Sequence, residues 1–368
     1  AECRALPLAD GRQRTVETGP GAPLCGVVRA QAVPAPNPPR AGITHRPAAA
    51  GFEAVPVTVA GATGTPRQGL IALRGDTAVV EVANTCGLAT LPGGRLRPLD
   101  SSSLGLGQAL RQALRYEPRR IVLALGGSAS TDGGMGLLTA MGFRFADAAG
   151  RVLPPSGRAL LDIAAVDVSA AVRLPTVELV LASDVTNPLT GPDGAAAVYG
   201  PQKGATSAQV RRLDTGLRRF VQTLSHTGFP RAPALAATPG AGSAGGVGFA
   251  ALLLGARPLS GADYFLDLLD FDRHRATADL IVTGEGRLDQ QTERGKLPAA
   301  IAHRAAPTPV IAVAGRSDLP RTHWPRAGFT HVYTLTDYTP TDTAQNPTLT
   351  AHLLTRIGTR IGRSSRTA

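Results

Sequence analysis

The segment IVLALGGSASTDGGMGLLTAMG, residues 121–142, constrains the fold of this chain more than any other stretch. Residues 121–125 are too apolar for a half-exposed strand and too few for a buried helix, which predicts a central strand covered on both faces. A loop of Gly, Ser, Thr and Asp follows, and then a run that suits a helix. We therefore expect a strand, a loop and a helix in an α/β fold.

The loop itself has the composition of an anion-binding site. Its glycines leave backbone N–H groups uncovered and its hydroxyls supply further donors, a combination that binds phosphate or carboxylate at a helix N-terminus. A tight turn with a helix cap is the alternative, because the same residue types serve both purposes. The candidate phosphate- or substrate-binding residues are Gly126, Gly127, Ser128, Ser130, Thr131, Asp132, Gly133 and Gly134.

The length of 368 residues and the hydrophobic content of 43% indicate a globular protein with two domains. Apolar runs such as residues 249–254 are far shorter than the roughly 20 residues of a membrane span, and the start lacks signal-peptide features. The three cysteines are scattered and show no CxxC spacing. We expect a cytoplasmic protein without membrane association.

The net charge of +11 raises the question of nucleic-acid binding. That function requires clustered cations on one face, usually with aromatic side chains for stacking. The arginines of this chain are dispersed and aromatic residues make up only 4%. We expect no nucleic-acid partner.

The use of lysine is more informative than the charge. Only two of the 38 basic residues are lysines: Lys203 in GPQKG and Lys296 in RGK. Lysine is a compact point charge and a frequent phosphate partner, which predicts that both bind phosphate. Chance placement is the alternative, because lysines are so few.

Several further strands are expected along the chain. Residues 18–50 are rich in proline and predict irregular structure, whereas residues 52–60, 70–73 and 77–82 predict a small sheet. The strand at 177–182 ends in SDVTNPLTG, which places Asp184 and Asn187 just beyond its carboxyl end, where open α/β sheets bind ligands. A clear amphipathic helix follows at 207–224.

Residues 239–248, PGAGSAGGVG, contain GxGxxG spacing at Gly240, Gly242 and Gly245, of which Gly240 and Gly242 are candidate binding residues. A dinucleotide fingerprint requires a preceding strand and a later acidic residue, and neither is evident. The segment therefore predicts a second glycine-rich helix start that lines the site. An NAD-dependent oxidoreductase is the weaker alternative.

A strand at 279–283 is expected to open into a loop, GEGRLDQQTERGK, that carries Glu285, Asp289 and Lys296. The loop is not a P-loop, because Gln290 stands where its first glycine belongs. A helix from residue 298, strands at 310–314 and 331–335 and a last helix after residue 346 predict a βαβ-type lobe.

Together these loops suit phosphoryl transfer. The reaction requires donors and cations around a polyphosphate, carboxylates for Mg²⁺, and a base for the attacking hydroxyl. Asp184, Glu285 and Asp289 are the candidates for base or metal ligand, with the metal assigned to Asp184 and Asp289. The catalytic set is Asp184, Lys203, Glu285, Asp289 and Lys296.

GGSASTDGGMGLLTAMGF, SDVTNPLTGPDGAAAVYGPQKGAT, PGAGSAGGVG and TGEGRLDQQTERGKLP, in this order, resemble the type I glycerate kinase family over roughly residues 52–335. The resemblance implies ATP- and Mg²⁺-dependent phosphorylation of D-glycerate to 2-phosphoglycerate, with 3-phosphoglycerate left open. It implies a cleft between a Rossmann- or flavodoxin-like domain, residues 1–51 plus 276–368, and an inserted α/β domain, residues 52–275. In that cleft the 126–134 loop would bind phosphate or the glycerate carboxylate.

The beginning of the chain departs from the family pattern. Residues 9–17, ADGRQRTVE, are similar to the family's Ala-Asp-Gly-Gly-Glu-Gly-Thr segment but contain Arg12, Gln13 and Arg14 at three positions. The family's opening strand and Asp-Ser-Phe-Lys-Gly motif have no counterpart here. We expect a truncated or degraded start, and a catalytically inactive protein that binds glycerate or nucleotide is the alternative. Whether two copies form a homodimer stays open.

Overall fold

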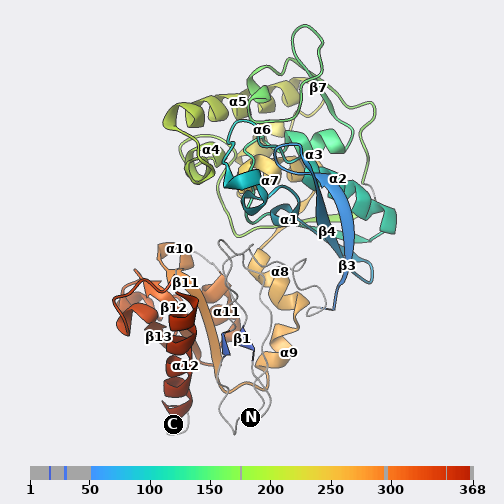
Figure 1. Cartoon of the computed structure of the whole chain (residues 1–368). Coiled ribbons are helices and arrows are strands. Elements are labelled where there is room, and N and C mark those ends of the chain that lie inside the picture. Colours follow the sequence, from blue (N-terminus) through green and yellow to red (C-terminus); the bar gives the residue numbers. More distant parts are fainter. Residues whose placement is uncertain are drawn as a thin grey trace. The chain divides into compact units, whose positions relative to one another are not determined.

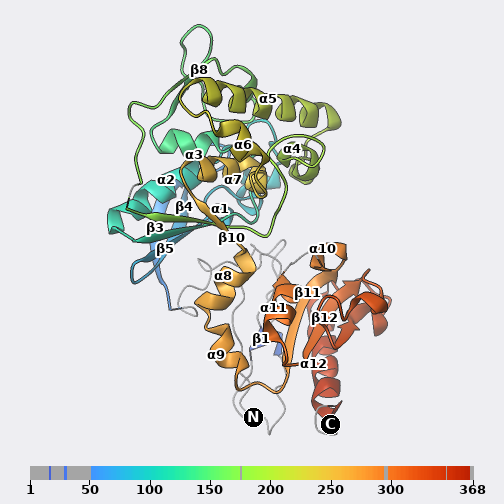
Figure 2. The same cartoon turned by 180° about the vertical axis from the view of Figure 1, so that it is seen from behind.

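The structure is a computed structural model that describes residues 16–17, 29–30, 51–174, 176–293, 297–344 and 346–364. The chain divides into two compact units, one formed by residues 42–261 and the other by residues 262–368 together with 1–41 (Figures 1 and 2). The domain limits expected from the sequence, at 51/52 and 275/276, stay a prediction. Within residues 18–50, which were predicted to be irregular, the structure describes only residues 29–30. Lys296 lies outside the described residues.

Unit 42–261 is built on one mixed six-stranded sheet. Its order is β10-β9-β6-β5-β4-β3, in which β3, β4 and β5 are antiparallel neighbours and β5, β6, β9 and β10 run parallel. The strands are β3 (Glu53–Ala60), β4 (Pro66–Arg74), β5 (Thr77–Glu81), β6 (Arg120–Ala124), β9 (Glu178–Ala182) and β10 (Arg257–Leu259).

Strand β6 is central, as its apolar run predicted. It lies between β5 and β9, and Ile121, Val122 and Leu123 are fully buried, so both faces of the strand are covered. The α/β fold is thereby confirmed for this unit. The helices around the sheet are α1 (Val82–Cys86), α2 (Leu104–Ala113), α3 (Met135–Ala140), α4 (Ala195–Tyr199), α5 (Ser207–His226), α6 (Ala232–Ala237) and α7 (Ser243–Leu253).

The spacing of apolar residues in helix α5 determines which face of the helix is buried. Leu213, Leu217, Phe220 and Leu224 are fully buried on one face, and the arginines of the helix lie on the others. A capping box begins the helix, since Gln209 N–H bonds the Thr206 hydroxyl and the Gln209 side chain bonds Thr206 N–H. A small antiparallel pair, β7 (Arg144–Ala146) and β8 (Ala165–Asp167), completes the unit.

The second unit contains a parallel sheet of order β11-β12-β13: β11 (Ile281–Leu288), β12 (Val310–Ser317) and β13 (His331–Thr334). Alternate residues of β12 face opposite cores. Val310, Ala312 and Ala314 pack with α11 and its neighbours, whereas Ile311 and Val313 pack with α12. The helices are α8 (Gly261–Leu268), α9 (Phe271–Arg275), α10 (Gln290–Glu293), α11 (Leu297–Ala305) and α12 (Pro347–Ser364), and β1 (Val16–Glu17) pairs β2 (Arg29–Ala30).

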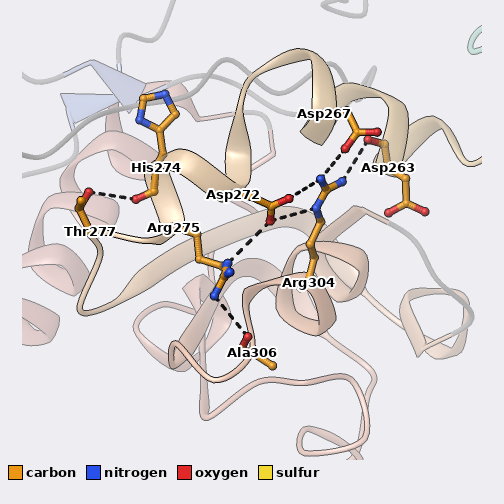
Figure 3. A network of polar contacts seen from close by, with 8 residues as sticks. All are labelled: Asp263, Asp267, Asp272, His274, Arg275, Thr277, Arg304 and Ala306. Atoms are coloured by element: carbon orange, nitrogen blue, oxygen red, sulfur yellow. Dashed lines mark hydrogen bonds and ion pairs between the residues drawn. The ribbon is translucent and has the colours of Figure 1, made fainter.

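A polar network joins three helices of this unit (Figure 3). The guanidinium of Arg304 on α11 bonds the carboxylates of Asp267 on α8 and Asp272 on α9, the latter at 2.7 Å. It also donates to the carbonyl oxygen of Asp263 at 3.4 Å. The Arg304 guanidinium holds the pKa of the Asp272 carboxyl below its ordinary value, against a smaller opposing effect of burial. The network therefore fixes α8 and α9 against α11.

The structure corrects the expected loop at residues 284–288. Strand β11 does not stop at Thr283 but continues to Leu288, so Glu285 is a strand residue. The reason is the neighbouring strand: the ladder to β12 runs on through Glu285 opposite Ala314 and Leu288 opposite Ser317. Among the residues that the structure describes, no helix combines the length and the apolar character of a membrane span.

Candidate active site

The parallel strands β6 and β9 bring two of the expected polar segments together. Ala124 pairs with Ala182, so the loop 125–134 and the loop 183–188 leave the same edge of the sheet from neighbouring strands. Neighbouring strands lie about 4.8 Å apart. The candidate site of unit 42–261 therefore lies at the carboxyl ends of β6 and β9.

The beginning of α7 packs directly on the loop after β6. Gly133 N–H bonds the Gly245 carbonyl oxygen at 3.0 Å. Gly245 has φ +72°, and a Cβ atom there would lie 2.1 Å from the Ser130 carbonyl oxygen. Only glycine fits such a position, because a side chain would both strain the backbone and displace the loop. As expected, this segment is a glycine-rich helix start, and α6 rather than a strand precedes it.

Lys203 is part of the same cluster. It ends the short 3-10 helix Pro201–Lys203 and is only 2% exposed. Its ammonium donates to the Ser128 hydroxyl oxygen at 2.9 Å and to the Ser130 carbonyl oxygen. A Cβ atom on Gly245 would lie 2.9 Å from Nζ. The lysine thus supports the loop from inside.

Asp132, a predicted ligand-binding residue, is bonded within the protein. Its carboxylate accepts from the backbone N–H of Ser103, Gly134 and Gly136, at 2.7, 3.1 and 3.2 Å, and from the Ser103 hydroxyl at 2.8 Å. These donors lie at the beginnings of α2 and α3, so the carboxylate caps two helices. A ligand role for this residue is untested, whereas its capping role is visible.

The hydroxyls of the loop differ in accessibility. Ser130 and Thr131 are fully buried, and their hydroxyl oxygens have no hydrogen-bond partner within the described part of the chain. Ser128 keeps 5% of its surface exposed, and Gly126 is exposed. Of the hydroxyls predicted to bind a ligand, Ser128 is therefore the most accessible.

The loop after β9 is held by several hydrogen bonds. Asn187 accepts from the Tyr199 hydroxyl at 2.6 Å and donates to the Asp193 carbonyl oxygen at 2.8 Å, and its own carbonyl oxygen accepts from Gly242 N–H at 2.9 Å. Burial raises the pKa of the Tyr199 phenol, which keeps it a neutral donor. Asn187 thus joins α4 to the beginning of α7.

Asp184 lies two residues beyond the end of β9 and is exposed. The Ser260 hydroxyl donates to its Oδ1 at 3.3 Å. Gly240 lies close by in the chain fold, since a Cβ atom on it would be 3.3 Å from the Val185 carbonyl oxygen. Asp184 is therefore a carboxylate that solvent and ligands can reach at the edge where the two loops meet.

Sequence reasoning missed three contributors to this cluster: Ser183, Tyr199 and Ser243. Gly245 was recognised only as part of the glycine spacing. The Ser183 and Ser243 hydroxyls bond each other at 2.7 Å and so join the end of β9 to the beginning of α7. Tyr199 bonds Asn187, which lies 12 residues away in the chain, and Ser183 and Ser243 are 60 residues apart. No local pattern signals such pairs.

The remaining predicted residues lie in the second unit. The Thr292 hydroxyl donates to Glu285 Oε1 at 2.7 Å, and Asp289 N–H donates to the Thr292 oxygen at 3.2 Å. Thr292 thus contacts the carboxylate of Glu285 and the backbone of Asp289 at the beginning of α10. Lys296 lies outside the described residues.

The buried thiol of Cys86 has no reactive character. Burial raises its pKa to about 11, so the thiol stays protonated at neutral pH. Its carbonyl oxygen accepts from Ala129 N–H at 3.2 Å, which places α1 against the loop after β6. Cys86 is therefore a packing residue of the site.

Within the described ranges, no group of three or more His, Cys, Asp or Glu side chains could hold a metal ion. Mg²⁺ in kinases is commonly bound through one or two carboxylates plus substrate phosphates, so a dedicated cluster is not required. The exposed carboxylate of Asp184 fits that mode.

Comparison with known proteins identifies the family. The sequence pattern of the glycerate kinase family matches residues 42–366. The chain belongs to the glycerate kinase family. Its kinase relatives include the glycerate kinase of Bacillus subtilis (strain 168), 38% identical over 325 residues that cover 86% of this chain and 76% of that protein. The predicted family resemblance is thereby confirmed.

Other members of the glycerate kinase family match a smaller share. The glycerate 2-kinase of Escherichia coli (strain K12) is 37% identical over 66% of this chain and 64% of its own length, so the chain spans slightly less than two thirds of that relative. A crystal structure of a putative glycerate kinase 2 from Salmonella typhimurium LT2 is similar over 88% of this chain and 87% of that one, with a TM-score of 0.68 and 33% identity. The α/β fold is thus shared with a solved structure.

Proposed function

We propose that the chain is a D-glycerate kinase that transfers the γ-phosphoryl group of Mg·ATP to a glycerate hydroxyl. The observation that carries the proposal is the cluster at the edge of β6 and β9, in a chain of this family. There Lys203 bonds the loop that we propose to bind an anion, and the exposed Asp184 lies in the loop from the neighbouring strand. The product is 2-phosphoglycerate, with 3-phosphoglycerate as the alternative.

The proposed chemistry assigns a role to each group. The loop 126–134 holds an oxyanion of the substrate, and Lys203 supplies positive charge beneath it. A carboxylate accepts the proton of the attacking hydroxyl as its oxygen bonds to phosphorus and ADP departs. Asp184 is the candidate in unit 42–261, and Glu285 and Asp289 are the candidates in the second unit. The residues that would hold Mg²⁺ are Asp184 and Asp289, and the ion would neutralise charge on the phosphate oxygens. Lys296 is proposed as a further phosphate partner.

The setting of the reaction is also a proposal. The cytoplasm is proposed as the compartment, because the three cysteines are scattered along the chain and show no CxxC spacing. Sedimentation of the full chain would measure whether it forms the proposed homodimer. The partners are D-glycerate and ATP.

A coupled assay with D-glycerate and Mg·ATP tests the proposal. We expect turnover by the unaltered chain and a loss of at least 100-fold for Asp184→Asn, the range typical of general base removal. A folded sample without turnover, in which Asp184→Asn behaves identically, would contradict it. Calorimetric binding of glycerate or nucleotide in such a sample would instead support an inactive binding protein.

A further inference from the structure

The bond between Lys203 and Ser128 has a direction that determines what Ser128 can do. An ammonium only donates, so the Ser128 hydroxyl oxygen is the acceptor of the 2.9 Å bond. Within the described part of the chain, Lys203 is the one partner found for this oxygen. The hydroxyl proton therefore points away from Lys203 and is available to another acceptor. A hydroxyl that accepts from a cation is also a stronger donor, because bonds in series polarise one another.

The lysine itself is poorly placed to touch a ligand. It is 2% exposed, and two of its three N–H donors are used by Ser128 and by the Ser130 carbonyl oxygen. Ser128 is also buried, with 5% of its surface exposed, but it lies two residues after Gly126, which is exposed. The Ser128 hydroxyl is therefore the group through which the charge of Lys203 acts on a ligand.

This arrangement suits a single negative charge. A polyphosphate carries several negative charges and is usually met by more than one directly bound cation, including Mg²⁺. A carboxylate carries one charge and is well bound by hydroxyl and backbone N–H donors. Asp184 lies in the loop after the neighbouring strand, and its carboxylate is exposed.

We propose that Ser128 binds the carboxylate of the acidic substrate, and that Lys203 is a positioning residue that orients and polarises its hydroxyl. The inference rests on the proposed function, because it names the substrate group held by the 126–134 loop. Gly245 is required for this arrangement, because the absence of a side chain at this position leaves room for Lys203 Nζ and for the Ser130 carbonyl oxygen.

Titration calorimetry on the full chain, with D-glycerate, with its neutral analogue glyceramide and with ADP, tests the inference. For Ser128→Ala and Lys203→Met we expect glycerate to bind about 10-fold more weakly, the loss expected for a hydrogen bond to a charged group. Binding of glyceramide and of ADP should change less than about twofold, within ordinary surface effects. The exposed Ser169→Ala is the matched control and should leave all three unchanged.

The discrimination between glycerate and glyceramide separates this role from a structural one, because a damaged loop would weaken both ligands. Weaker ADP binding with unchanged glycerate binding would assign the loop to phosphate and overturn the inference. If the unaltered chain does not phosphorylate D-glycerate, the proposed function fails. The inference is then judged on Ser128-dependent binding of glycolate and lactate, and its absence would overturn the inference as well.

Discussion

The carboxylate of Asp132 accepts two hydrogen bonds from one residue, from Ser103 N–H at 2.7 Å and from the Ser103 hydroxyl at 2.8 Å. The same Ser103 hydroxyl oxygen accepts from Leu137 N–H at 3.0 Å. Both residues are fully buried. The pair therefore ties the beginning of α2 to the beginning of α3 and fixes one end of the loop that we assign to substrate.

Replacing Asp132 with alanine should therefore destabilise unit 42–261 strongly. The substitution leaves three buried backbone N–H groups without their acceptor, and each such group costs about 1–3 kcal/mol. We expect a loss of about 3 kcal/mol or more in the free energy of unfolding, measured by urea denaturation. Asp76→Ala removes an exposed carboxylate in the turn after β4 and should change it by less than about 0.5 kcal/mol. Equal effects of the two variants would refute the capping role.

Substitution of Gly245 and of Gly64 separates the cost of lost space from the cost of backbone strain, because both glycines have a positive φ but only Gly245 has close neighbours. Gly245→Ala places a Cβ atom 2.1 Å from the Ser130 carbonyl oxygen at φ +72°, so we expect loop displacement and a loss above 2 kcal/mol or so in stability. Gly64→Ala introduces similar strain at φ +86° but meets no atom within 4 Å, and should cost about 1 kcal/mol. Thermal unfolding and glycerate binding of both variants check the difference. Similar losses would show that packing at Gly245 is unimportant.

The Arg304 network predicts a pH-dependent contribution to the second unit. Because the Asp272 pKa is lowered in the folded state, its stabilisation is present above the ordinary carboxyl pKa of about 4 and is lost as pH falls through the folded value. Arg304→Met should cost about 1 kcal/mol at pH 7, a modest figure because Asp272 is more than half exposed. The cost should shrink below pH 4.

Urea unfolding at pH 7, 5 and 3.5 measures this change. Arg158→Met serves as the control, since it breaks a pair with Asp100 in which both side chains are about half exposed and should have a smaller effect. A cost for Arg304→Met that stays constant down to pH 3.5 would contradict the linkage.

A stabilising substitution is expected at Glu117. This residue adopts a left-handed conformation with φ +49° at the end of the 3-10 helix Leu114–Tyr116. The strain of about 1 kcal/mol exceeds the entropy that glycine adds to the unfolded chain, so Glu117→Gly should raise stability by about 0.5 kcal/mol. Glu117→Ala keeps the strain and should change little. A lower unfolding midpoint for the glycine variant would contradict the prediction.

Much of the fold could be predicted because its signals are local. The apolar run at 121–125 predicted the buried strand β6, and the spacing of Leu213, Leu217, Phe220 and Leu224 predicted α5. Strand β11 was predicted too short, because its continuation through Glu285 depends on pairing with β12. Periodicity reports the burial of a segment's faces, whereas the length of a strand also depends on its neighbour.

The sequence by itself determined the α/β class, the family, and the loops that carry Gly, Ser, Asp and Lys. Only the tertiary structure decided which of these groups meet. It assigned Asp132 to capping helices, bonded Lys203 to Ser128 across 75 residues, and placed Gly245 against Ser130. The physical reason is that backbone propensity and hydrophobic period act over a few residues. The direction of a hydrogen bond and the burial of a charge are set by atoms that the fold brings from distant parts of the chain.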